Sequence, residues 1–308
     1  MNRQMHSIPD YDGVYRHELE TALTAAAAAS TVVLEFYSAQ SADTYTKPDG
    51  SPVTDADLAS DRTIREIIGA AFPGDALLTE EGATDEARLA NSRVWIVDPI
   101  DGTQQFIAHT GEFDVLIALA IDGRPVVAAS ANPASGLVVA AVKGAGAWEI
   151  AGEGVSPFTI AVSEEPPRLV SSIWYGGRED EGRAAAVSRI AARLGATELP
   201  VMDVGYHARR FLDTARTYDA YIGLPPPVGA SIAQEWDLAC VDLITTEAGG
   251  SFSDCWGRQH RYNKRSTGIS GGILASASAA LHHRLLAATE PEVSSTPAAL
   301  DPADDGLA

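Results

Sequence analysis

Hydrophobic and polar positions in the first third of the chain follow the periods of helices and strands in turn. A polar stretch, residues 1–12, predicts a flexible N-terminus, and apolar residues at helical spacing over 15–40 predict a long amphipathic helix. A second helix should open around Thr54 and run to about Ala71, since Thr54 suits the N-cap and acids follow it in the first turn. The β-branched and aromatic run at 93–97 predicts a buried strand.

The remainder of the chain predicts an antiparallel meander followed by alternating strands and helices. The meander covers 113–121, 126–131 and 137–142, with Asp122-Gly123 as a hairpin turn. Later strands are expected at 169–174, 198–201, 220–222, 250–253 and 272–275, and helices at 181–194, 206–217, 236–247 and 279–288. This pattern predicts an α/β (α+β) layered sandwich in two lobes, 13–165 and 166–288, with the acids described below at their seam.

Composition narrows the class of protein. The chain has 308 residues, of which 45% are hydrophobic, enough for one large or two smaller cores. The net charge of −20 argues against a nucleic acid polymer or an anionic membrane as partner. Cys240 and Cys255 form neither a disulfide framework nor a metal motif. No signal peptide or membrane-spanning run is evident, so a cytoplasmic location is expected. The tail 289–308 has Pro, Ser and acids without Lys or Arg, and should be disordered.

The string WIVDPIDGTQQF at 95–106 carries the main chemical signal. Asp98 follows the predicted strand, and Pro99 keeps it extended, so a helix cannot begin there. Asp101 lies three residues on, past the bend, so both carboxylates can turn toward one point. The carbonyl of Ile100 lies between them and could be a third oxygen ligand. Oxygen ligands are those that Mg²⁺ prefers.

Two small residues follow these acids. Gly102 has no Cβ to block the approach of its amide to a ligand. Thr103 can open a short helix, 103–109, whose free N–H groups favour an anion. The alternative is a solvated turn between a strand and a helix. This is the more frequent structure of an Asp-Pro-X-Asp-Gly sequence that has no other acids to accompany it.

Further acids occur where they could join this site. Glu80 and Glu81 follow another predicted strand, and since neighbouring strand residues face opposite ways, only one should reach a metal. Asp57 and Asp237 each fall in the first turn of a predicted helix. The alternatives are a solvated pair of glutamates and two acids that only complement helix dipoles.

Four motifs together resemble the inositol monophosphatase superfamily of Mg²⁺-dependent, lithium-sensitive phosphatases. They occur in the family's order, and the resemblance covers about residues 14–288. The motifs are Val-Thr-x-x-Asp at 53–57, Glu-Glu at 80–81, Asp-Pro-Ile-Asp-Gly-Thr at 98–103, and Trp-Asp at 236–237 followed by Glu-Ala-Gly-Gly at 247–250. The resemblance implies a layered αβαβα sandwich of the inositol monophosphatase and fructose-1,6-bisphosphatase type, and a homodimer.

The resemblance also implies roles for individual residues. Two Mg²⁺ ions are expected, the first surrounded by Glu80, Asp98, the Ile100 carbonyl and Thr103, and the second by Asp98, Asp101 and Asp237. A third, weaker Mg²⁺ would lean on Glu80. Asp57 with Thr103 would orient and help to deprotonate the attacking water, and the amides of Gly102 and Thr103 would bind phosphate.

Within the superfamily, the segment KPDGSPVT at 47–54 is most similar to 3'(2'),5'-bisphosphate nucleotidases. The chain departs from them at Gly205, Tyr206 and His207, where two larger side chains replace small residues. Tyr206 could stack on a base, or both could simply pack on a helix. Ala230 stands where inositol monophosphatases carry an acid, and the loop 223–234 contains three prolines and looks longer. Gln104-Gln105 replaces a Lys-Glu pair.

The sequence thus predicts a Mg²⁺-dependent phosphomonoesterase for a small phosphorylated metabolite. A 3'(2')-phosphorylated nucleotide is the leading substrate. The alternatives are an inositol or other sugar-phosphate phosphatase and a non-catalytic, metal- or ligand-binding paralogue. Lys47 could fold over the site from the loop before Asp57, the alternative being an exposed loop lysine.

Overall fold

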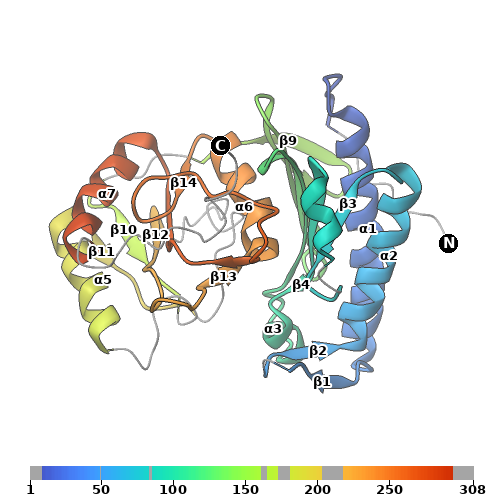
Figure 1. The fold of residues 1–308 in the computed structure, drawn as a ribbon, viewed down its shortest axis with the longest axis horizontal. Helices are drawn as coiled ribbons and strands as arrows, with labels where there is room; N and C mark the ends of the chain where they lie inside the picture. The colour runs from blue at the N-terminus through green and yellow to red at the C-terminus, as the bar shows by residue number, and fades with distance from the viewer. Residues whose placement is uncertain are drawn as a thin grey trace.

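The computed structural model describes residues 9–48, 50–82, 85–160, 165–172, 181–202 and 218–293. Helices and sheets stack in five layers (Figure 1). Helices α1 and α2 form one outer layer and a seven-stranded sheet lies beneath them, followed by helix α6, a five-stranded sheet, and an outer layer of α5 and α7. The predicted αβαβα sandwich is confirmed.

The first outer layer consists of α1 (Arg16–Ala39) and α2 (Asp55–Ala71). By length and apolar composition α1 could cross a membrane. One face of it is nevertheless buried in the core beneath, and that face consists of Leu19, Thr21, Ala22, Leu23, Ala25, Ala26, Ala29 and Val33. Its many alanines have short side chains that allow close packing, as expected of a core helix.

The seven-stranded sheet runs in the order β3-β4-β5-β6-β7-β8-β9. Only β3 and β4 pair in parallel. The bounds are β3 Ala76–Thr79, β4 Arg93–Asp101, β5 Asp114–Ile121, β6 Arg124–Asn132, β7 Leu137–Val142, β8 Gly146–Ala151 and β9 Gly154–Phe158. The predicted meander is confirmed as β5 to β7, and Asp122 and Gly123 both have positive φ, as a two-residue hairpin turn requires.

Strands β8 and β9 extend this sheet beyond the predicted meander. The sequence GAWEIA of β8 mixes apolar and charged residues, and β9 is largely exposed. Neither strand therefore shows the continuous apolar run that identifies the buried strands.

The five-stranded sheet has the order β11-β10-β12-β16-β14. Its strands are β10 Arg168–Val170, β11 Thr197–Glu198, β12 Ala220–Gly223, β14 Ser251–Ser253 and β16 Ile273–Ser276. The strand predicted at 169–174 ends at Val170 and that predicted at 198–201 ends at Glu198, although an isolated bridge between Ser172 and Met202 prolongs their pairing. Residues 173 and 174 lie outside the described residues. The helix predicted at 206–217 lies outside the described residues.

Two small two-stranded sheets and two small helical segments complete these lobes. One sheet is the hairpin of β1 (Thr44–Thr46) and β2 (Pro52–Thr54), and the other pairs β13 (Ala233–Gln234) with β15 (Gly268–Ile269), which are far apart in the sequence. The helical segments are a 3₁₀ turn, η1 (Glu86–Ala90), and a helix of five residues, α3 (Thr103–Ile107). The β1–β2 hairpin and α3 lie together at one end of the large sheet (Figure 1).

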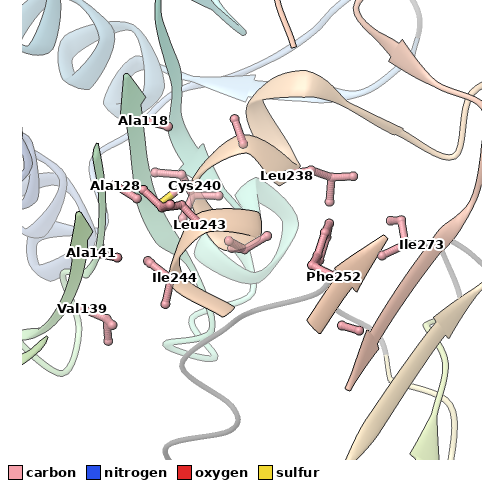
Figure 2. Close-up of a cluster of buried hydrophobic side chains, with 14 of the residues drawn as sticks. Ala118, Ala128, Val139, Ala141, Leu238, Cys240, Leu243, Ile244, Phe252 and Ile273 are labelled. Atoms are coloured by element: carbon pink, nitrogen blue, oxygen red, sulfur yellow. The ribbon is translucent and has the colours of Figure 1, made fainter. Parts of the chain in front are cut away.

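Helix α6 (Glu235–Glu247) forms the middle layer and is buried against both sheets. Figure 2 shows its side chains between small residues of the large sheet and apolar residues of the small sheet. The labelled residues are Leu238, Cys240, Leu243 and Ile244 on α6, Ala118, Ala128, Val139 and Ala141 on one side, and Phe252 and Ile273 on the other. As predicted, Cys240 packs inside; it is a free thiol.

The other outer layer is α5 (Glu181–Leu194) and α7 (Ala279–Val293). We predicted that the last helix ends at Ala288 and that a disordered tail begins at Thr289; this boundary is wrong. Thr289 and Val293 are buried, and Glu292 pairs with Arg189 and Arg193 of α5. These tertiary contacts extend the helix through a segment whose composition alone suggests a tail.

The two lobes are joined by a buried polar contact as well as by α6. Asp242 of α6 is 1% exposed, and it accepts hydrogen bonds from Arg124 at 3.1 Å and from the hydroxyl of Tyr262 at 2.9 Å. Burial raises the pKa of Asp242, and Arg124 and Tyr262 oppose that rise. The carboxylate therefore depends on both partners.

Replacing Tyr262 by Phe should lower the free energy of unfolding by about 1–3 kcal/mol, because a buried carboxylate loses one of its donors. Urea unfolding of the metal-free protein measures this. Tyr45→Phe, at an exposed tyrosine beside Asp55, is the matched control and should leave the stability unchanged. Equal stability of Tyr262→Phe and the control would contradict this account of the seam.

Candidate active site

Asp57 links the start of α2 to Thr103, the first residue of α3. Its Oδ2 accepts hydrogen bonds from the Thr54 amide at 2.8 Å and the Thr54 hydroxyl at 2.6 Å, closing a capping box. Its Oδ1 accepts a hydrogen bond from the Thr103 hydroxyl at 3.1 Å. Burial raises the pKa of Asp57, against these hydrogen bonds. Asp57 is thus both the capping acid and the partner of Thr103.

Asp98 and Asp101 lie on a strand that bends, whereas we predicted that the strand ends at Asp98. β4 continues to Asp101, and its register with β5 shifts between the two aspartates. Pro99 has no N–H to give to the ladder, which explains the irregularity at this point. Asp98 is buried and accepts a hydrogen bond from the Ile100 amide at 3.0 Å. The Ile100 carbonyl accepts one from Thr103 at 3.2 Å.

Gly102 is required by its conformation. It has φ 91°, and a Cβ would lie 2.8 Å from the carbonyl oxygen of Glu112. The sequence analysis explains this glycine by access of a ligand to its amide; the left-handed backbone and the close approach of Glu112 are further reasons. The helix after it, α3, ends at Ile107, two residues earlier than predicted, and His109 has φ 55°.

Asp237 stands at the start of α6 as Asp57 stands at the start of α2. Its Oδ2 accepts a hydrogen bond from the Gln234 amide at 2.7 Å, again as part of a capping box. Burial, Asp101 and Glu80 raise the pKa of Asp237 well above its usual value. Burial, Glu80, Asp101 and Asp237 do the same to the pKa of Asp98. The four carboxylates therefore repel one another across a single space.

Lys47 reaches these acids from the loop between β1 and β2. Its Nζ lies 2.7 Å from an oxygen of Glu80 and 2.7 Å from an oxygen of Glu81, and its side chain is only 15% exposed. Burial would lower the pKa of Lys47, but Glu80 and Glu81 raise it above its usual value. Burial and Glu80 raise the pKa of Glu81 to about 7 despite Lys47. Both glutamates face one cation because β3 ends at Thr79, so strand alternation no longer applies.

The donor set fits Mg²⁺ chemically. It offers carboxylate and carbonyl oxygens, which are the ligands of hard cations, and the Lys47 ammonium shows that positive charge is accepted beside Glu80. As they stand, no three His, Cys, Asp or Glu side chains of the described residues are arranged to hold one ion. Rotation of these side chains would be needed to close a coordination shell.

The predicted substrate contacts are only partly visible. Gly205, Tyr206 and His207 lie outside the described residues. The loop 223–234 is fixed near both ends, since Arg183 donates to the Leu224 and Pro225 carbonyls and the Ile232 amide donates to Ile269 at 2.7 Å. Between these ends the chain is exposed, including Ala230, and Val228 is 79% exposed.

Asn132 is a structural support that the sequence did not single out. Its Nδ2 lies 2.6 Å from the carbonyl oxygen of Phe113 and 2.9 Å from Asp114, and it is buried at the end of β6. These contacts hold the segment against which Gly102 packs. An Asn before a proline signals only a local turn, so its long-range contacts give no signal in the sequence.

Repulsion among the four carboxylates should lower the stability of the metal-free protein. Because the pKa of Asp98 is raised in the folded protein, the folded state holds this proton more tightly than the unfolded state does, and stability falls as the pH rises from about 4 through the folded-state pKa. With a chelator at neutral pH, Asp98→Asn should raise the melting temperature, by roughly 2–4 °C for each kcal/mol of repulsion removed. It should also flatten the decline with pH.

Thermal unfolding in chelator at several pH values measures both effects. Glu66→Gln, at an exposed glutamate on α2, is the control for loss of one negative charge. If the two variants behave alike, local repulsion at Asp98 is not the cause.

The chain is similar to known proteins over most of its length. The model of the Inositol monophosphatase family matches residues 15–294. A histidinol-phosphatase of Chlorobaculum parvum is 31% identical over 271 residues, covering 88% of this chain and 96% of the relative. A 3'(2'),5'-bisphosphate nucleotidase CysQ of Aggregatibacter actinomycetemcomitans is 27% identical over 235 residues, covering 73% and 80% respectively.

Solved structures share the fold. CysQ from Bacteroides thetaiotaomicron, a bacterial member of the inositol monophosphatase family, superposes with a TM-score of 0.68 at 26% identity, covering 84% of this chain and 97% of that one. An inositol monophosphatase from Anabaena gives 0.63 at 25% identity, covering 89% and 95%. The family predicted from the four motifs is confirmed: the chain belongs to the inositol monophosphatase family and is a phosphoric monoester hydrolase.

Proposed function

We propose that the protein is a Mg²⁺-dependent phosphomonoesterase that cleaves a small phosphate monoester by attack of water. The observation that carries this proposal is the convergence of Glu80, Asp98, Asp101 and Asp237 beside a threonine hydroxyl bonded to a buried aspartate. Four converging carboxylates require cations. A hydroxyl held between two acceptors can in turn receive a proton from water.

Thr103 and Asp57 form the route for that proton. The Thr103 hydroxyl donates to Asp57 at 3.1 Å and lies 3.2 Å from the Ile100 carbonyl, so its lone pairs are free to accept from a water. As the water loses its proton to Thr103 Oγ1, Thr103 passes its own to Asp57 Oδ1. The raised pKa of Asp57 makes this carboxylate a better proton acceptor than an ordinary aspartate.

The other residues hold the reacting groups in place. In the proposed assignment Glu80, Asp98, the Ile100 carbonyl and Thr103 hold one Mg²⁺, and Asp98, Asp101 and Asp237 hold another, with a weaker third at Glu80. Bound there, the ions would activate water and neutralise charge on the phosphoryl group and the leaving oxygen. The Gly102 and Thr103 amides would donate to phosphate oxygens. Lys47 would have to release Glu80 for the site to fill.

Histidinol phosphate is the first substrate to test. Two relatives named histidinol-phosphatase are each 31% identical to this chain. The net charge of −20 also suits a substrate that carries a cationic amine better than one with two phosphates. The nucleotide favoured by the sequence motifs becomes the second candidate, supported by the CysQ relatives at 27–28% identity. An inositol phosphate has less support, because Ala230 provides no carboxylate for its hydroxyls.

Family resemblance extends the proposal to a Li⁺-sensitive homodimer, and the cytoplasmic location expected in the sequence analysis is kept with it. These three properties stay predictions. Inhibition of turnover by Li⁺ tests the lithium sensitivity, and the molecular mass in solution tests the homodimer.

Phosphate release from a panel of histidinol phosphate, 3'-phosphoadenosine 5'-phosphate and inositol phosphates tests the activity. Turnover should require Mg²⁺, stop on chelation, and fall by at least about 1,000-fold in Asp98→Asn, as for loss of a central charge-stabilising group. Glu66→Gln should keep the wild-type rate. Turnover without metal would overturn the mechanism, and metal binding without turnover of any phosphate ester would support a non-catalytic paralogue.

Salt dependence separates the two leading substrates. Raising ionic strength from about 0.05 to 0.5 M screens the field of an acidic protein. The kcat/KM for a bisphosphorylated nucleotide should therefore rise with salt, whereas that for histidinol phosphate, which carries an amine, should change little. Measurements at saturating Mg²⁺ exclude an effect on metal loading. Parallel salt responses would show that the overall charge does not select between these substrates.

A further inference from the structure

Helix α2 carries polar side chains on the face that it turns toward β4 and the end of β3, which carry proposed metal ligands. One side of the helix carries Asp57, Ser60, Asp61 and Arg65, which are separated in turn by three, one and four residues. Ser60 is 0% exposed and Asp61 is 8% exposed. A helix face packed on a sheet is normally apolar, so each of these buried polar groups must have a partner.

Ser60 contacts the irregular part of β4. Its hydroxyl donates to the carbonyl of Pro99 at 2.9 Å, and both atoms are buried. Pro99 lies between Asp98 and Asp101, where the pairing with β5 shifts. The next carbonyl in the chain, that of Ile100, is a proposed metal ligand. Fixing the Pro99 peptide therefore limits how the Ile100 carbonyl and the flanking carboxylates can turn.

Arg65 contacts the end of β3. Its Nε donates to Asp61 at 2.6 Å, and its Nη2 donates to the hydroxyl of Thr79. Thr79 is the last residue of the strand, directly before Glu80. Gly82 leaves room for the guanidinium, since a Cβ there would lie 1.7 Å from Nη2. Arg65 is thus packed against the turn that carries Glu80 and Glu81.

The three contacts reach three different segments of the site. Asp57 bonds to Thr103, Ser60 to Pro99 and Arg65 to Thr79. We propose that Ser60 and Arg65 are positioning residues for metal binding, which hold the Ile100 carbonyl and Glu80 in the geometry that the ions require. This inference rests on the proposed metal site. The competing explanation is that both residues contribute to fold stability and to nothing else.

Metal affinity distinguishes the two explanations. Removing the hydrogen-bond partner of a metal ligand typically weakens metal affinity by about 10- to 100-fold. Titration calorimetry of the chelator-stripped full chain with Mg²⁺ alone should show about 10-fold weaker binding in Ser60→Ala and in Arg65→Gln. The melting temperature in chelator, measured alongside, reports on stability independently of metal.

The same helix offers matched controls. Thr63→Ala removes a hydroxyl that bonds to the Ala59 carbonyl of its own helix at 2.8 Å, and Arg62→Gln removes an exposed arginine charge. Both controls should bind Mg²⁺ as the wild type does. If Ser60→Ala and Arg65→Gln also keep wild-type affinity, with or without a lower melting temperature, the positioning role is overturned.

The wild type and Asp98→Asn are titrated first, so that failure of the inference differs from failure of the proposed function. If the wild type binds no Mg²⁺, or if Asp98→Asn binds it equally well, the metal site itself is overturned. If Asp98→Asn loses binding and the α2 variants do not, only the role of Ser60 and Arg65 is overturned.

Discussion

Repulsion among buried carboxylates is the constraint on which the rest of this structure depends. Glu80 and Asp101 raise the pKa values of Asp98 and Asp237, because the four carboxylates converge from separate parts of the chain. Flexible acids in such a position would turn away into water. These acids remain together because strands, helix starts and the contacts of α2 fix their backbones. The scaffold therefore maintains an arrangement in which the carboxylates repel one another unless protons or cations neutralise them.

Helix starts contribute to this site in a way that joins stability to function. Asp57 and Asp237 each occupy the third position of a helix and accept a hydrogen bond from the backbone amide three residues earlier. The cap fixes one carboxylate oxygen of each acid, and the other oxygen of Asp57 accepts a hydrogen bond from Thr103. The capping alternative considered for these acids is therefore compatible with a catalytic role. Two helices from different layers meet at the same place, and each brings one oriented acid.

Much of this was readable in the sequence, and the failures share one physical cause. Apolar runs identified β5 to β7, and four motifs identified the family and its acids, because both signals are local. The strands β8 and β9 and the extension of α7 to Val293 depend on tertiary contacts that local patterns do not encode. Ser60 and Arg65 resemble ordinary helix residues until their partners on other strands are known. The residues around Tyr206 lie outside the described part of the chain, so their role as substrate contacts stays a prediction.

The central position of α6 has a consequence for how the chain reaches its native state. The large sheet is complete by Phe158, yet its inner face is covered by a helix that begins at Glu235. During synthesis, about 80 residues must follow before the apolar residues of that face can be buried, and contacts of such long sequence separation form slowly. Until α6 has been made, the inner face of the large sheet therefore has no cover from this helix. A nascent chain that ends soon after Phe158 exposes an apolar surface, which must be covered by the later part of the chain or by a chaperone.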